Sequence, residues 1–129
     1  MNFLETSELL ARIQVGDNRK VDDLVIEEWW HLVRDLRLDD AIEAVREHRR
    51  VSGEYLTAQH VRAGVRRLRS QRLERTPLPE PPGGMTPVEY LAWLRTTRQA
   101  IADGRPPALV PALVGPPRDL PAIRPPRKP

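Results

Sequence analysis

Apolar residues recur every three or four positions along the first half of this chain, which is the spacing of amphipathic α-helices. The first such segment begins near residues 5–6, where Thr6 or Ser7 can cap the free backbone N–H groups. It ends at Gly16, because glycine readily takes the left-handed conformation that closes a helix. The apolar face of this predicted helix consists of Leu9, Leu10 and Ile13.

A second helix is predicted over residues 22–36, with Asp22 and Asp23 at its positive N-terminal end. Its apolar positions cover nearly half of the circumference, which is typical of a helix that contacts several neighbours. We therefore expect this helix at the centre of the core. Its apolar positions are Val25, Ile26, Trp29, Trp30, Leu32, Val33 and Leu36.

Two more helices are predicted before the first proline. The third follows a turn at residues 37–38, begins at Asp40, which has capping-box spacing to Glu43, and ends before Ser52. The fourth starts with Thr57 as its N-cap. Its apolar stripe consists of Val61, Val65 and Leu68.

Proline changes the picture, since all 14 prolines lie at or beyond Pro77. A proline inside a helix removes a hydrogen bond and costs about 3 kcal/mol, so residues 76–85 are predicted to be a semi-rigid Pro/Gly linker. Thr86 and Glu89 then have the spacing of a capping box around a proline at the first helical position. Because Gly104 follows the last turn, a fifth helix is predicted from about Pro87 to Asp103.

The predicted fold class is therefore all-α. Residues 1–75 form a compact four-helix module, and residues 76–85 connect it to the single capped helix of residues 86–104. Residues 105–129 are rich in proline and arginine and lack periodicity, so we expect a tail that is disordered when unbound. A module of about 75 residues can bury a modest core without disulfides.

Charge is distributed unevenly, although the net charge is only +3. Residues 1–47 hold 6 Lys or Arg against 12 Asp or Glu, whereas residues 48–75 hold 8 basic and 2 acidic residues. Such asymmetry is typical of surfaces that meet a charged partner. The alternative is intramolecular, with the acidic and basic stretches facing each other.

An arginine stripe on the fourth helix is the clearest candidate for nucleic-acid contact. Arg62, Arg66 and Arg69 lie three or four residues apart, so they share one side of the helix. Guanidinium groups in such a row contact phosphates with an affinity that falls with salt. The same side chains can instead meet an acidic protein, or pair with the acidic first half of the chain.

Aromatic and aliphatic residues on the fifth helix are candidates for a partner anchor. Trp93 lies beyond the linker, with Tyr90 and Leu94 one turn or less away. Tryptophan and tyrosine dominate the binding energy of many protein interfaces. The alternative is that Trp93 packs the fifth helix back onto the N-terminal module.

Catalytic and metal-binding chemistry finds little support in the sequence. The chain has no cysteine, and its histidines, His31, His48 and His60, do not form a zinc pair at a spacing of four residues. No phosphate-binding glycine loop or nucleophile motif is present. We expect neither an enzyme nor a cofactor or metal site. Because the N-terminus lacks the features of a signal peptide and no stretch reaches the about 20 apolar residues of a membrane helix, we expect a cytoplasmic location.

Four segments together resemble a family of small helical proteins encoded by actinobacterial phages and prophages, whose N-terminal halves are similar to phage replicative-helicase loaders, also called loader-and-inhibitor proteins. The segments are Asp17-Asn18-Arg19-Lys20-Val21-Asp22, Glu28-Trp29-Trp30-His31, Asp40-Ala41 with Ala44-Val45 and His48, and Tyr55-Leu56-Thr57-Ala58-Gln59-His60-Val61. The resemblance covers roughly residues 5–73. Ala58 stands where members of that family usually carry a proline.

The resemblance implies a function in DNA replication. In that family a helical N-terminal domain is joined to a flexible region that engages the hexameric helicase, so we expect a phage-type replication accessory protein that binds a replicative helicase or another replisome component. Two alternatives remain open. One is a DNA-binding regulator that uses the arginine-rich fourth helix, and the other is a phage inhibitor of a host protein.

Overall fold

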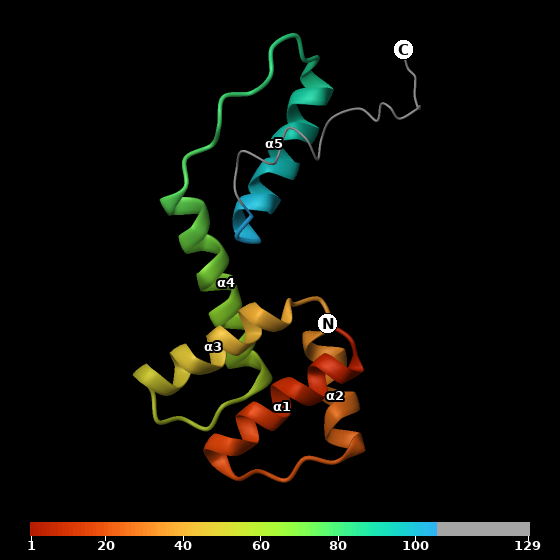
Figure 1. Ribbon diagram of the computed structural model, residues 1–129, viewed down its shortest axis with the longest axis vertical. Coiled ribbons are helices and arrows are strands. Elements are labelled where there is room, and N and C mark those ends of the chain that lie inside the picture. The colour runs from red at the N-terminus through yellow and green to blue at the C-terminus, as the bar shows by residue number, and fades with distance from the viewer. Residues whose placement is uncertain (106–129) are drawn as a thin grey trace. The chain divides into compact units, whose positions relative to one another are not determined.

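The protein, seen in a computed structural model, is described over residues 1–105, so all but the first residue of the predicted tail lies outside the described part. Within this range every regular element is an α-helix, which confirms the all-α prediction (Figure 1). The helices are α1 (Phe3–Asp17), α2 (Asp23–Val33), α3 (Leu38–Val51), α4 (Ala58–Arg75) and α5 (Pro87–Ala102).

The chain divides into two compact units, Met1–Leu68 and Arg69–Pro129. The boundary falls inside α4, so this helix contributes residues to both units. Residues 76–86, which include the proline-marked linker, are not helical and belong to the second unit.

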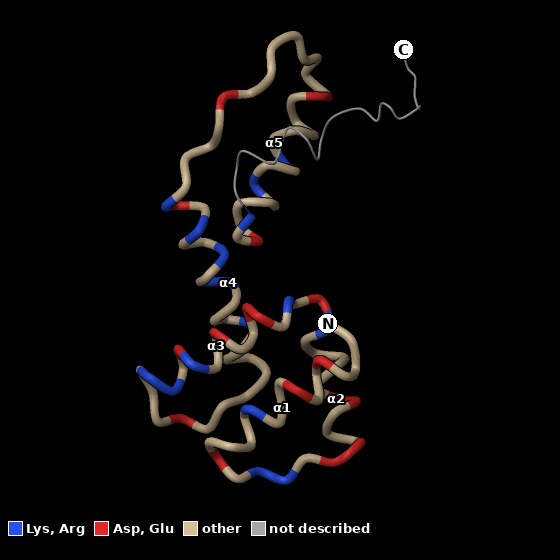
Figure 2. Tube along the Cα trace, in the orientation of Figure 1, with Lys and Arg blue, Asp and Glu red and all other residues tan. Residues whose placement is uncertain are grey.

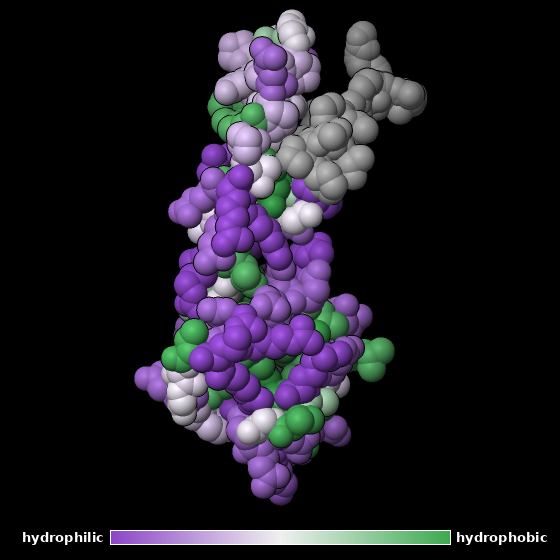
Figure 3. All heavy atoms as spheres, turned by 60° about the vertical axis from the view of Figure 1, so that its left-hand side comes forward, coloured by the Kyte–Doolittle hydropathy of each residue, from purple (hydrophilic) through white to green (hydrophobic). Residues whose placement is uncertain are grey.

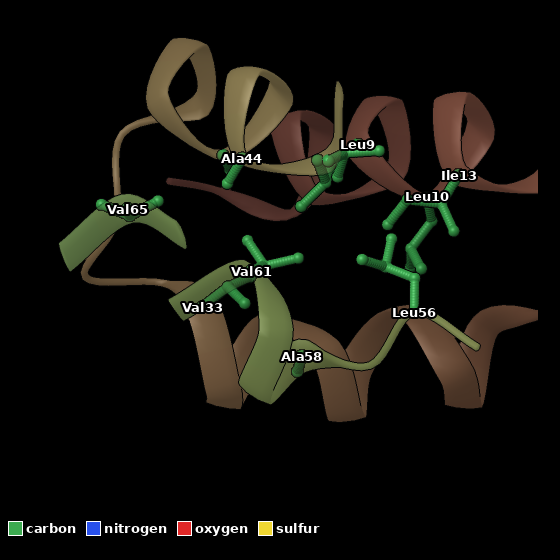
Figure 4. Packing of buried hydrophobic residues seen from close by; sticks show 11 residues of the cluster. Leu9, Leu10, Ile13, Val33, Ala44, Leu56, Ala58, Val61 and Val65 are labelled. Atoms are coloured by element: carbon green, nitrogen blue, oxygen red, sulfur yellow. The ribbon is translucent and has the colours of Figure 1, made fainter. Parts of the chain in front are cut away.

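One hydrophobic core holds the first unit together. In Figure 4, Leu56 and Leu10 point toward one another, and Val61 of α4 projects toward the side chains of α1 and α3. The core residues come from α1, α2, α3, α4 and the connection before α4, so each helix of the unit buries at least one side chain in it. The buried cluster consists of Leu9, Leu10, Ile13, Val33, Ala41, Ala44, Val45, Leu56, Ala58, Val61 and Val65.

Helix α1, rather than α2, lies at the centre of this core. It contacts both α2 and α3, and all three of its predicted apolar residues are fully buried. The prediction that the second helix is central is wrong, because only Val33 of α2 is buried and Leu24 and Leu32 are exposed. Val25, Ile26 and Trp29 pack against the core but are only partly buried, so α2 lies at its edge.

The ends of α1 differ from the prediction. Asn2, not Thr6 or Ser7, is the N-cap: its side chain accepts the Glu5 N–H, and the Glu5 carboxylate accepts the Asn2 N–H in return. Thr6 is instead buried in the first turn, and its hydroxyl donates to the Asn2 carbonyl. Asparagine caps as well as serine does, and the reciprocal bond to Glu5 favours the earlier start.

At its other end α1 closes on Asn18, which adopts the left-handed conformation with φ 60°. Gly16, predicted as the closing residue, lies within the last turn of the helix. The absence of a side chain at Gly16 leaves room for Arg49, since a Cβ there would lie 1.5 Å from Nη1 of that residue. Asparagine is the residue after glycine that most readily takes this conformation.

Two boundaries around the α2–α3 turn also require correction. Helix α2 ends at Val33, three positions before the predicted end at Leu36, although Asp22 caps its start as expected. Asp40 is not the cap of α3, which begins at Leu38 without a side-chain cap. Asp40 is buried in the first turn instead, where its carboxylate is close to the positive end of the helix.

The starts of α4 and α5 follow the predicted capping chemistry. The Thr57 hydroxyl accepts the His60 N–H at 3.4 Å, and His60 Nδ1 accepts the Thr57 N–H at 3.0 Å. Thr86 and Glu89 form the predicted capping box with Pro87 at the first turn. Both helices therefore begin where their local sequences specify.

Helix α5 ends in a complete Schellman motif. Gly104 has φ +82°, its N–H donates to Ile101 O, and the Arg105 N–H donates to Ala100 O, both at 2.9 Å. The predicted role of Gly104 is thereby confirmed. Apolar side chains of α5 differ in burial, because Ile101 is buried whereas Val88 and Leu91 are exposed.

Candidate functional site

Arg62, the first arginine of the predicted phosphate-binding stripe, is bound to the C-terminal end of α2. Its Nη1 donates to Leu32 O at 2.9 Å and to Asp35 Oδ1 at 2.7 Å, and its Nη2 donates to Asp35 Oδ2 at 3.1 Å. The hydrogen bond from Arg62 is the main reason that the pKa of Asp35 lies below its ordinary value of 3.8. This arginine therefore joins α4 to α2.

Arg69, the third member of the stripe, is paired within the second unit. Its Nη1 lies 2.5 Å from Asp103 Oδ1, and the two side chains are only 27% and 14% exposed. Arg66 is exposed and has no hydrogen bond or ion pair with the described residues. Arginines recur along α4 (Figure 2), yet of the three predicted arginines only Arg66 is free of a carboxylate in the described part of the chain.

Replacing Arg62 by alanine is expected to lower the free energy of unfolding by no more than about 1 kcal/mol, since its Asp35 partner is 62% exposed. Because the folded-state pKa of Asp35 is depressed, the pair stabilises the fold above the ordinary pKa of 3.8 and loses this contribution as the pH falls through the lowered value. Urea unfolding at pH 7 and pH 2 measures both effects. Arg66→Ala is the control and should leave stability unchanged at either pH.

The three residues proposed as partner anchors occupy different environments. Trp93 is 1% exposed, Leu94 is partly buried, and Tyr90 is 41% exposed and stacks on Trp93 with ring centroids 5.9 Å apart. Only Tyr90 presents a large area to solvent. Trp93 Nε1 and Thr97 Oγ1 are buried and have no hydrogen-bond partner among the described residues.

Helix α5 is fixed at its C-terminal end by arginines of α4, a role that sequence reasoning missed. Arg72 Nη1 donates to Ala102 O at 2.8 Å, and Arg69 pairs with Asp103 directly after the helix. Cationic groups at a helix C-terminus satisfy its free carbonyls and oppose its dipole. The available signal was the spacing of Arg69 and Arg72, one turn apart, which places both on one side of α4.

His48 and His60 do come together, at the connection between α3 and α4. Their rings are 4.4 Å apart, His48 Nε2 contacts Glu54 O at 2.8 Å, and His60 Nε2 lies 3.3 Å from Glu54 Oε1. Together with the Thr57 bond described above, these contacts occupy both His60 nitrogens in capping and loop closure. Within residues 1–105 no cluster of three or more His, Cys, Asp or Glu side chains is arranged to hold a metal ion.

A groove of about 500 Å³ lies between α1 and α3 in the first unit. Its lining contains three aliphatic side chains and four arginines, and no carboxylate. Sequence reasoning missed this groove because its residues belong to two helices whose pairing was not known in advance. The lining residues are Arg12, Val15, Ile42, Val45, Arg46, Arg49 and Arg50.

Comparison with known proteins gives no relative: no protein-family model, no curated protein and no solved structure matches the chain. Over the described residues, none of the helices is both long and apolar enough to span a bilayer. Function must therefore be inferred from the surfaces of the two units.

Proposed function

We propose that this chain is a non-catalytic accessory protein that binds another protein through the first turns of α5. The observation that carries the proposal is the exposure of apolar side chains there: Val88 is 77% exposed, Leu91 is 58% exposed, and Tyr90 lies between them in sequence. Exposed apolar residues that gather on one element are typical of interaction sites. The helix is preformed by its capping box and its Schellman motif, so a partner need not order it on binding.

The resemblance of residues 5–73 to phage helicase loaders supplies the first partner to test, a replicative helicase or another replisome component. In this proposal the first unit is the folded platform and α5 carries the anchors Tyr90 and Val88, with Trp93 buried beneath Tyr90 as support. The contact is hydrophobic, so its affinity should depend weakly on salt.

The test is binding of the full-length chain to a purified actinobacterial replicative helicase at micromolar concentration, with and without nucleotide. The double variant Val88→Ser/Leu91→Ser should weaken binding by at least about tenfold, since two apolar side chains leave the interface. Leu24→Ser is the matched control, because Leu24 is equally exposed on α2 at 66%. Absence of binding in both nucleotide states would refute the helicase as partner.

DNA binding through Arg62, Arg66 and Arg69 is the competing proposal, and the ion pairs of Arg62 and Arg69 count against it. It predicts an affinity for duplex DNA that falls steeply with salt and is lost in the triple alanine variant. Titration of a labelled duplex with the same protein preparation distinguishes the two proposals.

A further inference from the structure

The groove between α1 and α3 is lined by both aliphatic and basic side chains. Figure 3 shows a face of the molecule on which hydrophilic residues predominate and hydrophobic ones lie between them. At the groove, Val15 is 89% exposed, although a valine gains free energy by burial, and Ile42 is only partly buried. The volume of about 500 Å³ is within the range of sites that hold a ligand.

The groove is shaped by a close approach between α1 and α3. Arg49 crosses from α3 to α1, where its Nη2 donates to Ile13 O at 2.8 Å and lies 3.5 Å from Asp17 Oδ2. Gly16 makes room for this guanidinium, since any Cβ at that position would overlap it. The contacts of Arg49 with α1 therefore define one end of the groove.

The other three arginines of the groove take part in exposed ion pairs. Arg12 pairs with Glu8, Arg50 pairs with Glu43 and Glu47, and Arg46 lies 3.8 Å from Glu43. These pairs are exposed and therefore weak, so an incoming carboxylate can compete for the guanidinium. Each guanidinium has five N–H donors, and the pairs above use only part of them.

We propose that this groove binds an acidic amphipathic segment of a partner protein. Aliphatic side chains of the segment contact Val15 and Ile42 above the buried Val45, and its carboxylates meet the surrounding arginines. From residue 42 to residue 50, α3 rises about 12 Å, which matches roughly two turns of a bound helix. This surface is separate from the α5 surface, and its partner need not be the same protein.

Two other occupants match the lining less well than an acidic amphipathic segment does. Residues 106–129 of this chain carry four basic side chains and one acidic one, so they share the sign of the groove. Nucleic acid would contact the arginines through its phosphates but would offer no aliphatic side chains to Val15 and Ile42. An acidic and aliphatic peptide satisfies both parts of the lining.

The experiment titrates the full-length chain with a labelled 14-residue peptide in which leucines recur at helical spacing between glutamates. Binding should weaken with salt and should be at least about fivefold weaker in Val15→Ser and in Arg46→Ala. Both residues are exposed, so these variants keep the fold, which thermal unfolding verifies. Leu24→Ser and Arg66→Ala are the matched controls and should bind as the unmodified chain does.

Three results would overturn the proposal. They are no binding of the peptide at up to about 1 mM, equal binding of a version with lysine in place of glutamate, and binding unchanged by Val15→Ser and Arg46→Ala. A fourth such result is a set of amide chemical-shift changes confined to residues outside α1 and α3, which would place the peptide elsewhere. Because the probe contains no helicase, its failure is distinguishable from failure of the proposed function.

Discussion

Replacing Arg19 by methionine is expected to lower the free energy of unfolding of the first unit by about 3 kcal/mol. The Arg19 side chain is only 8% exposed and forms an ion pair with Asp17. Its Nη2 donates to Leu56 O at 2.7 Å, and its Cζ lies 4.1 Å from the ring centroid of Tyr55 and 6.0 Å from that of Trp29. One side chain thus joins the α1–α2 loop to the connection before α4.

Urea unfolding followed by circular dichroism measures this loss. The control is Arg12→Met, which removes an arginine from an ion pair that is about half exposed on both sides. That substitution should change the free energy of unfolding by less than about 1 kcal/mol. If the two variants lose equal stability, burial of Arg19 has no special role.

The stability that the Arg19–Asp17 ion pair provides should also depend on pH. The pKa of Asp17 lies below 3.8, chiefly because Arg19 donates a hydrogen bond to its carboxylate. The stabilisation is therefore complete above the unfolded-state pKa and is lost as the pH falls through the folded-state value. In Arg19→Met this part of the acid dependence should be reduced, leaving only the longer contact of Asp17 with Arg49.

Replacing Gly64 by valine is expected to cost about 3 kcal/mol, although glycine is a poor helix former. A Cβ at position 64 would lie 2.7 Å from the Cβ of Ala44 and 3.3 Å from its Cα, so α3 and α4 would have to separate. Both residues are buried, and the atoms that a new Cβ would meet belong to Ala44 close to the helix backbone, which cannot yield as the end of a long side chain does. Thermal unfolding measures the effect.

The reciprocal variant Ala44→Gly/Gly64→Ala tests the cause. It keeps one methyl group at the contact and exchanges helix propensities of about 1 kcal/mol in opposite directions, so stability should stay within about 1 kcal/mol of the unmodified chain. Gly53→Ala is the control for glycine replacement, because a Cβ there meets no atom within 4 Å. Equal losses in Gly64→Val and the reciprocal variant would contradict the steric explanation.

Local sequence signals predicted the helices well where they act within one turn. Thr57, Thr86 and Gly104 occupy their expected positions because capping depends on neighbours three or four residues away. The N-cap of α1 was misplaced because Thr6 satisfies its hydroxyl by donating back to Asn2 O, a bond that sequence alone does not distinguish from capping.

The contacts that define the surfaces could not be predicted in the same way. The arginine row on α4 was recognised, but its pairing with Asp35 and Asp103 depends on which helices become neighbours. Trp93 was identified as a large apolar side chain, whereas its burial depends on how the second unit packs. The groove requires α1 and α3 to lie side by side, which no pattern within either helix specifies.

The arginines of α4 also have a consequence for the order of folding. Along this helix Arg62, Arg66, Arg69, Arg72 and Arg75 follow each other at intervals of three or four residues, so each repels the next by about 0.2–0.5 kcal/mol. Gly64 weakens the same helix further, and the carboxylates that relieve the repulsion, Asp35 and Asp103, belong to other segments. An isolated peptide of residues 58–75 should therefore be mostly unfolded, and α4 gains its helicity from tertiary structure instead of nucleating it.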